Sequence, residues 1–304
     1  MPFTLGSDPE MMIVDTQGNY KSAIGIVQAH SELRIKKKGH EFYYDNVLAE
    51  CAIKPSSSAE EAVHNFRECL GIYKDMVAPY ILLPQASQNY PQEELQHEDA
   101  RKVNCAPEFC PYDMRQTDGP VNEIKSGTLR TCGGHVHLGH EDLNEEKGFL
   151  SMFIMDLLLG VPALWLDQDP TSATRRRMYG APGRYRVKDY GMEYRAISNF
   201  WLSSPALVEF VFNLSKFATE FVVNGDADEH WTFNLDVFYE NPRQAWTCHT
   251  YDVGNLRCGI QNSDKKLVEP HFQLAQSLMP KPLKEKMLEL CSYKPKPFYE
   301  EWKI

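Results

Sequence analysis

Residues 132–140 of this 304-residue chain read CGGHVHLGH, with two histidines two positions apart after a pair of glycines. In a β-strand, residues i and i+2 face the same side of the sheet. His135 and His137 therefore share one face of a short strand, and Val136 and Leu138 point to the other. Because short motifs are weak signals, an isolated pair of this kind is best interpreted as two histidines on a polar sheet face.

Three other segments repeat this pattern, and the repetition changes the interpretation. Asp8 and Glu10 are two residues apart at the head of the apolar run EMMIVD, and Glu50 stands within the apolar run VLAECAI. Glu193 and Arg195 share one face of the predicted strand MEYRAI. A carboxylate in an apolar strand is costly to bury unless it is paired or binds a metal. The four coincidences favour one shared acidic cavity over four separately solvated strand faces.

The types of donor in this set favour a hard divalent cation. Carboxylates outnumber imidazoles, and oxygen ligands of this kind suit Mg2+ or Mn2+. A catalytic zinc site typically has two or three nitrogen ligands with one carboxylate.

The stretch RRRMYGAPGRYRVKDYGMEYR, residues 175–195, concentrates basic side chains in an acidic protein. A net charge of -10 and a pI near 5.5 argue against a general binder of nucleic acid or anionic membrane. The interleaved glycines and tyrosines indicate a shaped loop, and arginine binds phosphate oxygens bidentately. Carboxylates that hold Mg2+ beside an arginine cluster are typical of a nucleoside triphosphate site. The P-loop pattern GxxxxGK[ST] does not occur in the sequence.

The rest of the chain predicts an α+β fold with an antiparallel sheet, because strands and long helices do not alternate regularly. A hairpin is expected around Asp45-Asn46, and helices are expected to begin at Ser58 and Ser204. Residues 167–191 are expected to form a loop region. The last 40 or so residues are expected to be helical, with breaks at Pro280 and Pro282.

The most apolar stretch, FLSMFIMDLLLGVPALWL, is predicted to be a buried helix that ends near Gly160 rather than a membrane span. No firm boundary divides the chain. The prediction is therefore a single catalytic domain over residues 1–304, with a helical C-terminal part from about 265. Eight cysteines without a CxxC pair, and no signal peptide at the start, predict reduced cysteines in a cytoplasm.

Four segments occur in order across roughly residues 5 to 205: GSDPEMMIVD, DNVLAE followed by Pro55, LRTCGGHVHLGH, and RRRMYGAPGRYRVKDYGMEYRAISNFW. Together they resemble the glutamine synthetase-like carboxylate-amine ligases, and more closely the phage and bacterial amidoligases called COOH-NH2 ligase type 2. The resemblance implies a curved antiparallel sheet with helices packed on its outer side. It also implies a concave face that carries two or three divalent ions and the phosphates of ATP.

The resemblance assigns roles residue by residue. It implies that the metal ligands are Glu10, Glu50, His135 and Glu193, with Asp8 as a fifth. Asp8 stands where glutamine synthetases carry a glutamate, so its shorter side chain is expected to act through water.

A second set of residues is implied to act on the phosphates. His137, Lys188 and Arg195 are expected to contact the phosphates of ATP, and Arg184 and Arg186 to guide the phosphates or an acyl phosphate.

The amine pocket cannot be matched residue by residue. Asp45 is a candidate for orienting the amine, and the expected catalytic set is then Glu193, Arg195, Arg186 and Asp45. The segment EFCPYDMRQTDG, residues 108–119, is placed near the acceptor carboxylate by family position alone.

The predicted function is an ATP-dependent ligase that phosphorylates a carboxylate and lets an amine attack the acyl phosphate, giving an amide, ADP and phosphate. One alternative is a metal-dependent hydrolase or oxygenase that uses His135, His137 and a carboxylate, which leaves the arginines unexplained. Another is an inactive ligase-like binding module, against which the complete ligand set argues.

The expected substrates are small-molecule or peptide carboxylates and amines, with no direct nucleic-acid or membrane partner. A monomer or a small homo-oligomer is expected, in the cytoplasm, or in the host cytoplasm if the chain is phage-encoded.

Overall fold

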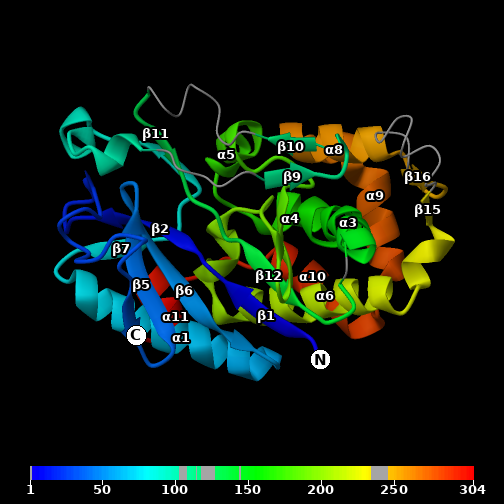
Figure 1. The fold of residues 1–304 in the computed structure, drawn as a ribbon, viewed down its shortest axis with the longest axis horizontal. Helices are drawn as coiled ribbons and strands as arrows, with labels where there is room; N and C mark the ends of the chain where they lie inside the picture. The colour runs from blue at the N-terminus through cyan, green and yellow to red at the C-terminus, as the bar shows by residue number, and fades with distance from the viewer. Residues whose placement is uncertain (1, 103–107, 114, 118–126, 144, 234–245) are drawn as a thin grey trace.

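The computed structural model describes residues 2–102, 108–113, 115–117, 127–143, 145–233 and 246–304. It shows a large antiparallel sheet with helices packed against it (Figure 1), which confirms the predicted α+β class. The strands of the large sheet are β1 (Thr4–Ser7), β2 (Glu10–Val14), β3 (Tyr20–Lys21), β4 (Ile35–Lys37), β5 (His40–Asp45), β6 (Leu48–Ser56), β7 (Ile81–Leu83), β9 (Glu108–Cys110), β10 (Arg115–Thr117), β12 (Val136–Gly139), β13 (Tyr185–Lys188) and β14 (Gly191–Tyr194). Two small sheets pair β8 (Ser87–Asn89) with β11 (Leu129–Thr131), and β15 (Trp231–Phe233) with β16 (Trp246–Cys248).

The helices lie mainly in the second half of the chain. They are α1 (Ala59–Val77), α3 (Glu145–Met155), the π-helical turn η3 (Asp156–Gly160), α4 (Val161–Leu166), α5 (Ser172–Met178), α6 (Pro205–Val223), α8 (Val253–Asn262), α9 (Lys265–Leu278), α10 (Lys281–Cys291) and α11 (Phe298–Trp302).

Strands β1 and β2 follow one another along the same edge of β6. They are separated by Asp8 and Pro9, and both pair with β6, where Glu10 lies opposite Glu50. On its other side β1 pairs with β12, and β12 pairs with β14. Strand β1 therefore connects the hairpin of β5 and β6 with β12 and β14, which come from the middle of the chain.

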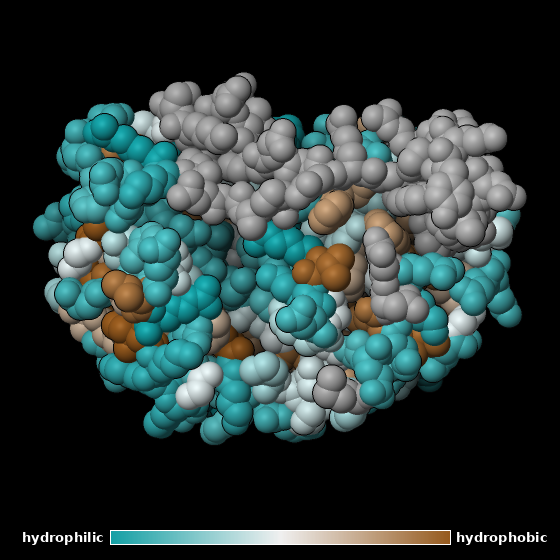
Figure 2. All heavy atoms as spheres, in the orientation of Figure 1, coloured by the Kyte–Doolittle hydropathy of each residue, from teal (hydrophilic) through white to brown (hydrophobic). Residues whose placement is uncertain are grey.

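The two faces of the sheet differ in polarity, as period-2 alternation requires. Leu5, Val136, Met192 and Tyr194 are buried on the face that packs against helices such as α1, α3 and α6. The opposite face carries a row of polar side chains in direct register: His137 lies opposite Glu193, and Glu193 lies opposite Arg186. The outer surface in the view of Figure 2 is largely hydrophilic, with scattered apolar patches.

The long apolar helix extends further than predicted. The prediction that this helix ends near Gly160 was wrong, because the helical chain continues through η3 and α4 to Leu166. Pro162 lies in the first turn of α4, where a proline is tolerated. Among the described helices, the stretch Glu146–Leu166 is the one with the length and composition to cross a membrane, and 89% of its apolar 18-residue window is buried inside the protein.

Several local predictions are confirmed. Ser58 and Ser204 cap α1 and α6 through their hydroxyl groups. The hairpin turns at Asn46, which adopts a left-handed φ of 54°. The expectation of a loop over residues 167–191 was incomplete, since this region also contains α5 and β13.

Asp156 is a charged group in the middle of the apolar helix layer, fully buried at the start of η3. Its carboxylate accepts hydrogen bonds from the hydroxyl groups of Tyr194, at 2.6 Å, and Tyr112, at 2.7 Å. Burial raises the pKa of Asp156 from 3.8 to about 6, although these hydrogen bonds favour the charged form. A raised pKa in the folded state means that the contribution of Asp156 to stability is complete below about pH 4. That contribution is lost as the pH rises through about 6.

Replacing Asp156 with asparagine removes this titration. We expect the Tm of Asp156→Asn, relative to wild type, to rise between pH 4 and pH 7 by the several degrees that about 3 kcal/mol represents. Differential scanning calorimetry across this pH range measures the difference, with the exposed Asp75→Asn as control. A difference in Tm that does not vary with pH would show that burial does not raise the pKa of Asp156.

Candidate active site

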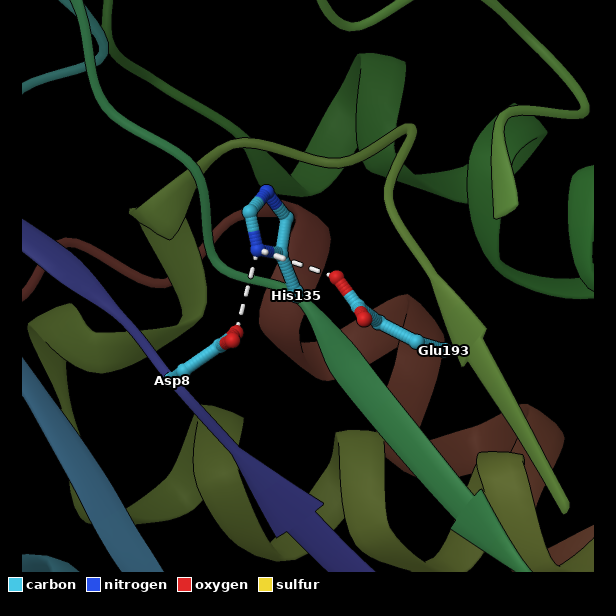
Figure 3. A group of neighbouring side chains, drawn as sticks. All are labelled: Asp8, His135 and Glu193. Carbon is cyan, nitrogen blue, oxygen red and sulfur yellow. Dashed lines mark hydrogen bonds and ion pairs between the residues drawn. The ribbon is translucent and has the colours of Figure 1, made fainter. Parts of the chain in front are cut away.

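Three side chains from three neighbouring strands converge on the polar face of the sheet. Asp8 follows β1, His135 precedes β12, and Glu193 lies in β14; we call them the histidine trio (Figure 3). His135 Nδ1 lies 3.0 Å from Asp8 Oδ1 and 3.7 Å from Glu193 Oε1. One possible ligand atom from each residue lies within 4.8 Å of the others, so the trio can surround a single cation.

A second group, which we call the carboxylate trio, consists of Glu10, Asp45 and Glu50. Their candidate ligand atoms also lie within 4.8 Å of one another. The direct pairing of Glu10 with Glu50 across β2 and β6 brings two of these carboxylates together, and Asp45 joins them from the end of β5. The Gly133 amide donates to Glu10 at 2.5 Å, and the Tyr43 hydroxyl donates to Glu50 at 2.9 Å.

The two trios are adjacent, because Asp8 and Glu10 are separated only by Pro9. Asp45, expected to orient an amine, thus lies within a possible cation site. The hairpin register could have indicated this, since Asp45 pairs with Leu48, which shares a face with Glu50.

The carboxylate trio carries an excess of negative charge. Burial raises the pKa of Glu10 to about 7 and also raises the pKa of Asp45. Burial, followed by repulsion from Asp8, Glu10 and Asp45, raises the pKa of Glu50 well above its ordinary value. A divalent cation would relieve this repulsion, and oxygen ligands match Mg2+ or Mn2+. The donors therefore fit a hard cation.

The histidine trio is electrostatically different, because basic groups already balance it. Burial and Asp8 would raise the pKa of Glu193, but Arg195 and the two histidines outweigh them and lower it to about 2. Burial would likewise raise the pKa of Asp8, yet His137 and His135 hold it well below its ordinary value. Burial and Arg195 lower the pKa of His135 to about 4. The lowered pKa of His135 favours its uncharged imidazole, which is the form that binds metals.

The basic residues predicted to contact phosphates gather around the same trio. Lys188 Nζ lies 2.7 Å from Glu193 Oε2, Arg186 lies 3.6 Å from Glu193 Oε1, and Arg195 also donates to Glu193. His137 Nε2 lies 3.1 Å from Asp8 Oδ1. The structure thus brings together basic side chains from β12, β13 and the residue after β14.

Two contributors were missed by the sequence analysis. Glu108 is buried, and its Oε2 lies 3.0 Å from Arg195 Nε while its Oε1 lies 3.7 Å from Arg184 Nε. The Tyr179 hydroxyl accepts a hydrogen bond from Arg195. No local spacing links these residues to Arg195. The predicted acceptor segment at 108–119 includes Glu108, but residues 114, 118 and 119 lie outside the described residues.

Not every arginine of residues 175–177 belongs to this cluster. Arg175 is fully buried and donates to the backbone carbonyls of Ala196 and Arg195. Arg176 pairs with Asp167 at 3.3 Å. These two guanidinium groups connect α5 to the segment after β14 and to the end of α4.

Residues 126–249 match the family model described as phage phiEco32-like COOH.NH2 ligase-type 2. The match agrees with the resemblance found in the sequence, and this segment is similar to that family. The description of that family is of a carboxylate-amine ligase, which is a class of enzyme. No curated protein matches the chain. The matched segment includes His135 and Glu193, but Asp8 and the carboxylate trio precede it, so their place in the site rests on geometry.

The two trios predict two cation sites that can be removed separately. Isothermal titration of the metal-free protein with Mn2+ should show two sites, of which Glu50→Gln loses one and Asp8→Asn weakens the other. Glu50→Gln should still fold, because the substitution removes a buried charge that neighbouring carboxylates repel. Its Tm without metal should therefore rise or stay unchanged.

The control is Glu209→Gln, which neutralises an exposed carboxylate on α6 and should leave both sites intact. If Glu50→Gln bound as much Mn2+ as wild type, Glu50 would be no ligand. If it unfolded, Glu50 would be a structural ion-pair partner.

Proposed function

We propose that this protein is an ATP-dependent carboxylate-amine ligase that forms an amide through an acyl phosphate. It acts on small-molecule or peptide acids and amines in the cytoplasm. The observation that carries the proposal is the direct adjacency of the two trios with basic side chains gathered against Glu193. We also propose that the sheet is curved, as in glutamine synthetase-like ligases, with this face on its concave side.

The proposed reaction has two steps. In the first, a carboxylate oxygen of the acid attacks the γ-phosphorus of ATP, the bond to the β-phosphate oxygen breaks, and ADP leaves. In the second, the amine attacks the carbonyl carbon of the acyl phosphate, the carbon–oxygen bond to phosphate breaks, and the amine loses a proton. Such chemistry depends on positioning and on neutralising developing charge.

The basic residues have a defined part in the first step. Arg195, Lys188 and Arg186 neutralise Glu193 in the metal-free protein. Mg2+ or Mn2+ held by the two trios would supply charge neutralisation at the phosphates. With Glu193 engaged by a cation, the three basic side chains can turn toward phosphate oxygens.

A cavity beside the histidine trio offers room for the nucleoside. Its volume is about 350 Å3, and residues of β1, β6 and β12 form most of its lining. Its lining includes Thr4, Lys54, His137 and Tyr190. The rings of Tyr190 and His137 are stacked, with their centroids 5.8 Å apart, and the Tyr190 hydroxyl lies 2.8 Å from His137 Nδ1. A nucleoside here would direct its phosphates past His137 toward the trios.

A zinc hydrolase that uses His135 and His137 fits less well. His135 Nδ1 and His137 Nε2 lie 3.0 and 3.1 Å from the same oxygen of Asp8. A zinc site built on these two imidazoles would give no role to the carboxylate trio. It also leaves the basic side chains around Glu193 without a function.

The proposal predicts which bond of ATP breaks. Incubation with ATP, Mg2+ and pooled amino acids and polyamines should yield ADP and phosphate in step with an amide product. Nucleotide chromatography and mass spectrometry measure both. AMP accumulating in step with product would refute the acyl-phosphate mechanism.

Arg195 should not tolerate lysine. Its guanidinium donates to Glu108, Glu193 and Tyr179 at once, and an ammonium group cannot reproduce this planar fork. We expect Arg195→Lys to lower kcat by about 100-fold. The exposed Arg177→Lys on α5 serves as the matched control and should keep its activity. Retention of kcat by Arg195→Lys would remove Arg195 from the proposed phosphate-binding group.

A further inference from the structure

Asp156 combines two unusual features. It is a fully buried aspartate, and it opens the π-helical turn η3 between α3 and α4. Turns of this kind inside α-helices are rare and often occur at functional sites. The turn lies behind the sheet, on the face opposite the two trios.

The carboxylate of Asp156 is bound by three separate segments of the chain. Tyr194, in β14, donates its hydroxyl at 2.6 Å, and Tyr112, in the turn after β9, donates at 2.7 Å. The backbone N–H of Gly183, just before β13, is the third donor. One side chain therefore links β9, β13 and β14 from behind.

Each of these segments carries a polar residue of the site. Tyr194 stands between Glu193 and Arg195, whose side chains point to the opposite face of the sheet. Gly183 directly precedes Arg184. Glu108, in β9, belongs to the same segment as Tyr112.

The packing around Asp156 leaves little room for displacement. A Cβ atom on Gly160 would lie 2.9 Å from the Tyr194 hydroxyl and 3.3 Å from Asp156 Oδ1. A Cβ atom on Gly183, whose φ is +74°, would lie 2.7 Å from the Tyr112 ring. Both glycines are thus required for the close approach of the phenols.

A second contact fixes the turn that carries Tyr112. Arg257, in α8, forms two hydrogen bonds to Asp113, at 2.9 and 2.6 Å. Its guanidinium also lies over the Tyr112 ring, at 5.2 Å from the centroid. The turn after β9 is therefore held by both η3 and α8.

We propose that Asp156 is a positioning residue of the active site, which holds β9, β13 and β14 in the register that lets Glu108 meet Arg184 and Arg195. The inference rests on the proposed function, because the value of this alignment lies in phosphoryl transfer by the arginines. A buried carboxylate costs stability in an apolar helix layer. Retaining it is consistent with a requirement of the site, where local stability is commonly given up for function.

The positioning role has a readout that does not depend on activity. Hydrogen–deuterium exchange should be faster in Asp156→Asn than in wild type for peptides covering 108–113 and 183–188. Tyr251→Phe is the matched control, because it removes a hydroxyl group that accepts a hydrogen bond from the Trp231 indole and not from any group that contacts Asp156, and it should leave these peptides unchanged. Unchanged exchange in Asp156→Asn would overturn the proposal.

The second readout is kinetic, at a temperature well below the Tm of every variant. Asp156→Asn should lower kcat at least about tenfold, because small misplacements of catalytic groups are costly. Its KM for ATP should change by less than about threefold, since the nucleoside cavity is not altered. Tyr112→Phe, which removes one donor and keeps the aromatic packing, should lower kcat in the same direction by a smaller factor.

The positioning role of Asp156 and the ligase activity are contradicted by different results. An active wild type with an equally active Asp156→Asn would overturn the positioning role and leave the ligase proposal standing. A wild type that forms no ADP with any acid and amine would overturn the ligase proposal, and the exchange experiment would still decide whether Asp156 holds the three segments.

Discussion

The repulsion among buried and half-buried carboxylates on the two sides of Pro9 is the constraint on which the site depends. Asp8 and Glu10 face the same side of the sheet, and each meets two further ligand-type groups from neighbouring strands. Antiparallel pairing forces this proximity, because Glu10 lies directly opposite Glu50. Buried charges of like sign are tolerated only when they are protonated, paired or bound to a cation.

The chain meets this constraint in two ways. In the histidine trio, Arg195, Lys188 and Arg186 neutralise Glu193, so that part of the site is balanced without a metal. In the carboxylate trio the pKa of Glu10 rises to about 7 instead, chiefly because of burial. The second trio therefore gains more from a divalent cation. On the reverse face, Asp156 and its phenol partners link the strands that carry the neutralising arginines.

Sequence periodicity could predict which residues face the site, because spacing by two within a strand is local. It identified His135 with His137, Asp8 with Glu10, and Glu193 with Arg195. It could not tell how the residues divide into two trios, since that depends on pairing between strands far apart in the chain. Glu108 and Tyr179 reach Arg195 entirely through such distant contacts. The helix that passes Gly160 was mispredicted because a π-helical turn leaves no simple signal, and because Pro162 falls where a new helical turn begins.

The most direct test of the account is to locate Mn2+ by anomalous scattering in crystals of the protein grown with Mn2+ and ADP. The account predicts two separate peaks, one bounded by Asp8, His135 and Glu193 and the other by Glu10, Asp45 and Glu50. A single tetrahedral metal on His135 and His137, with no peak at the carboxylate trio, would contradict it.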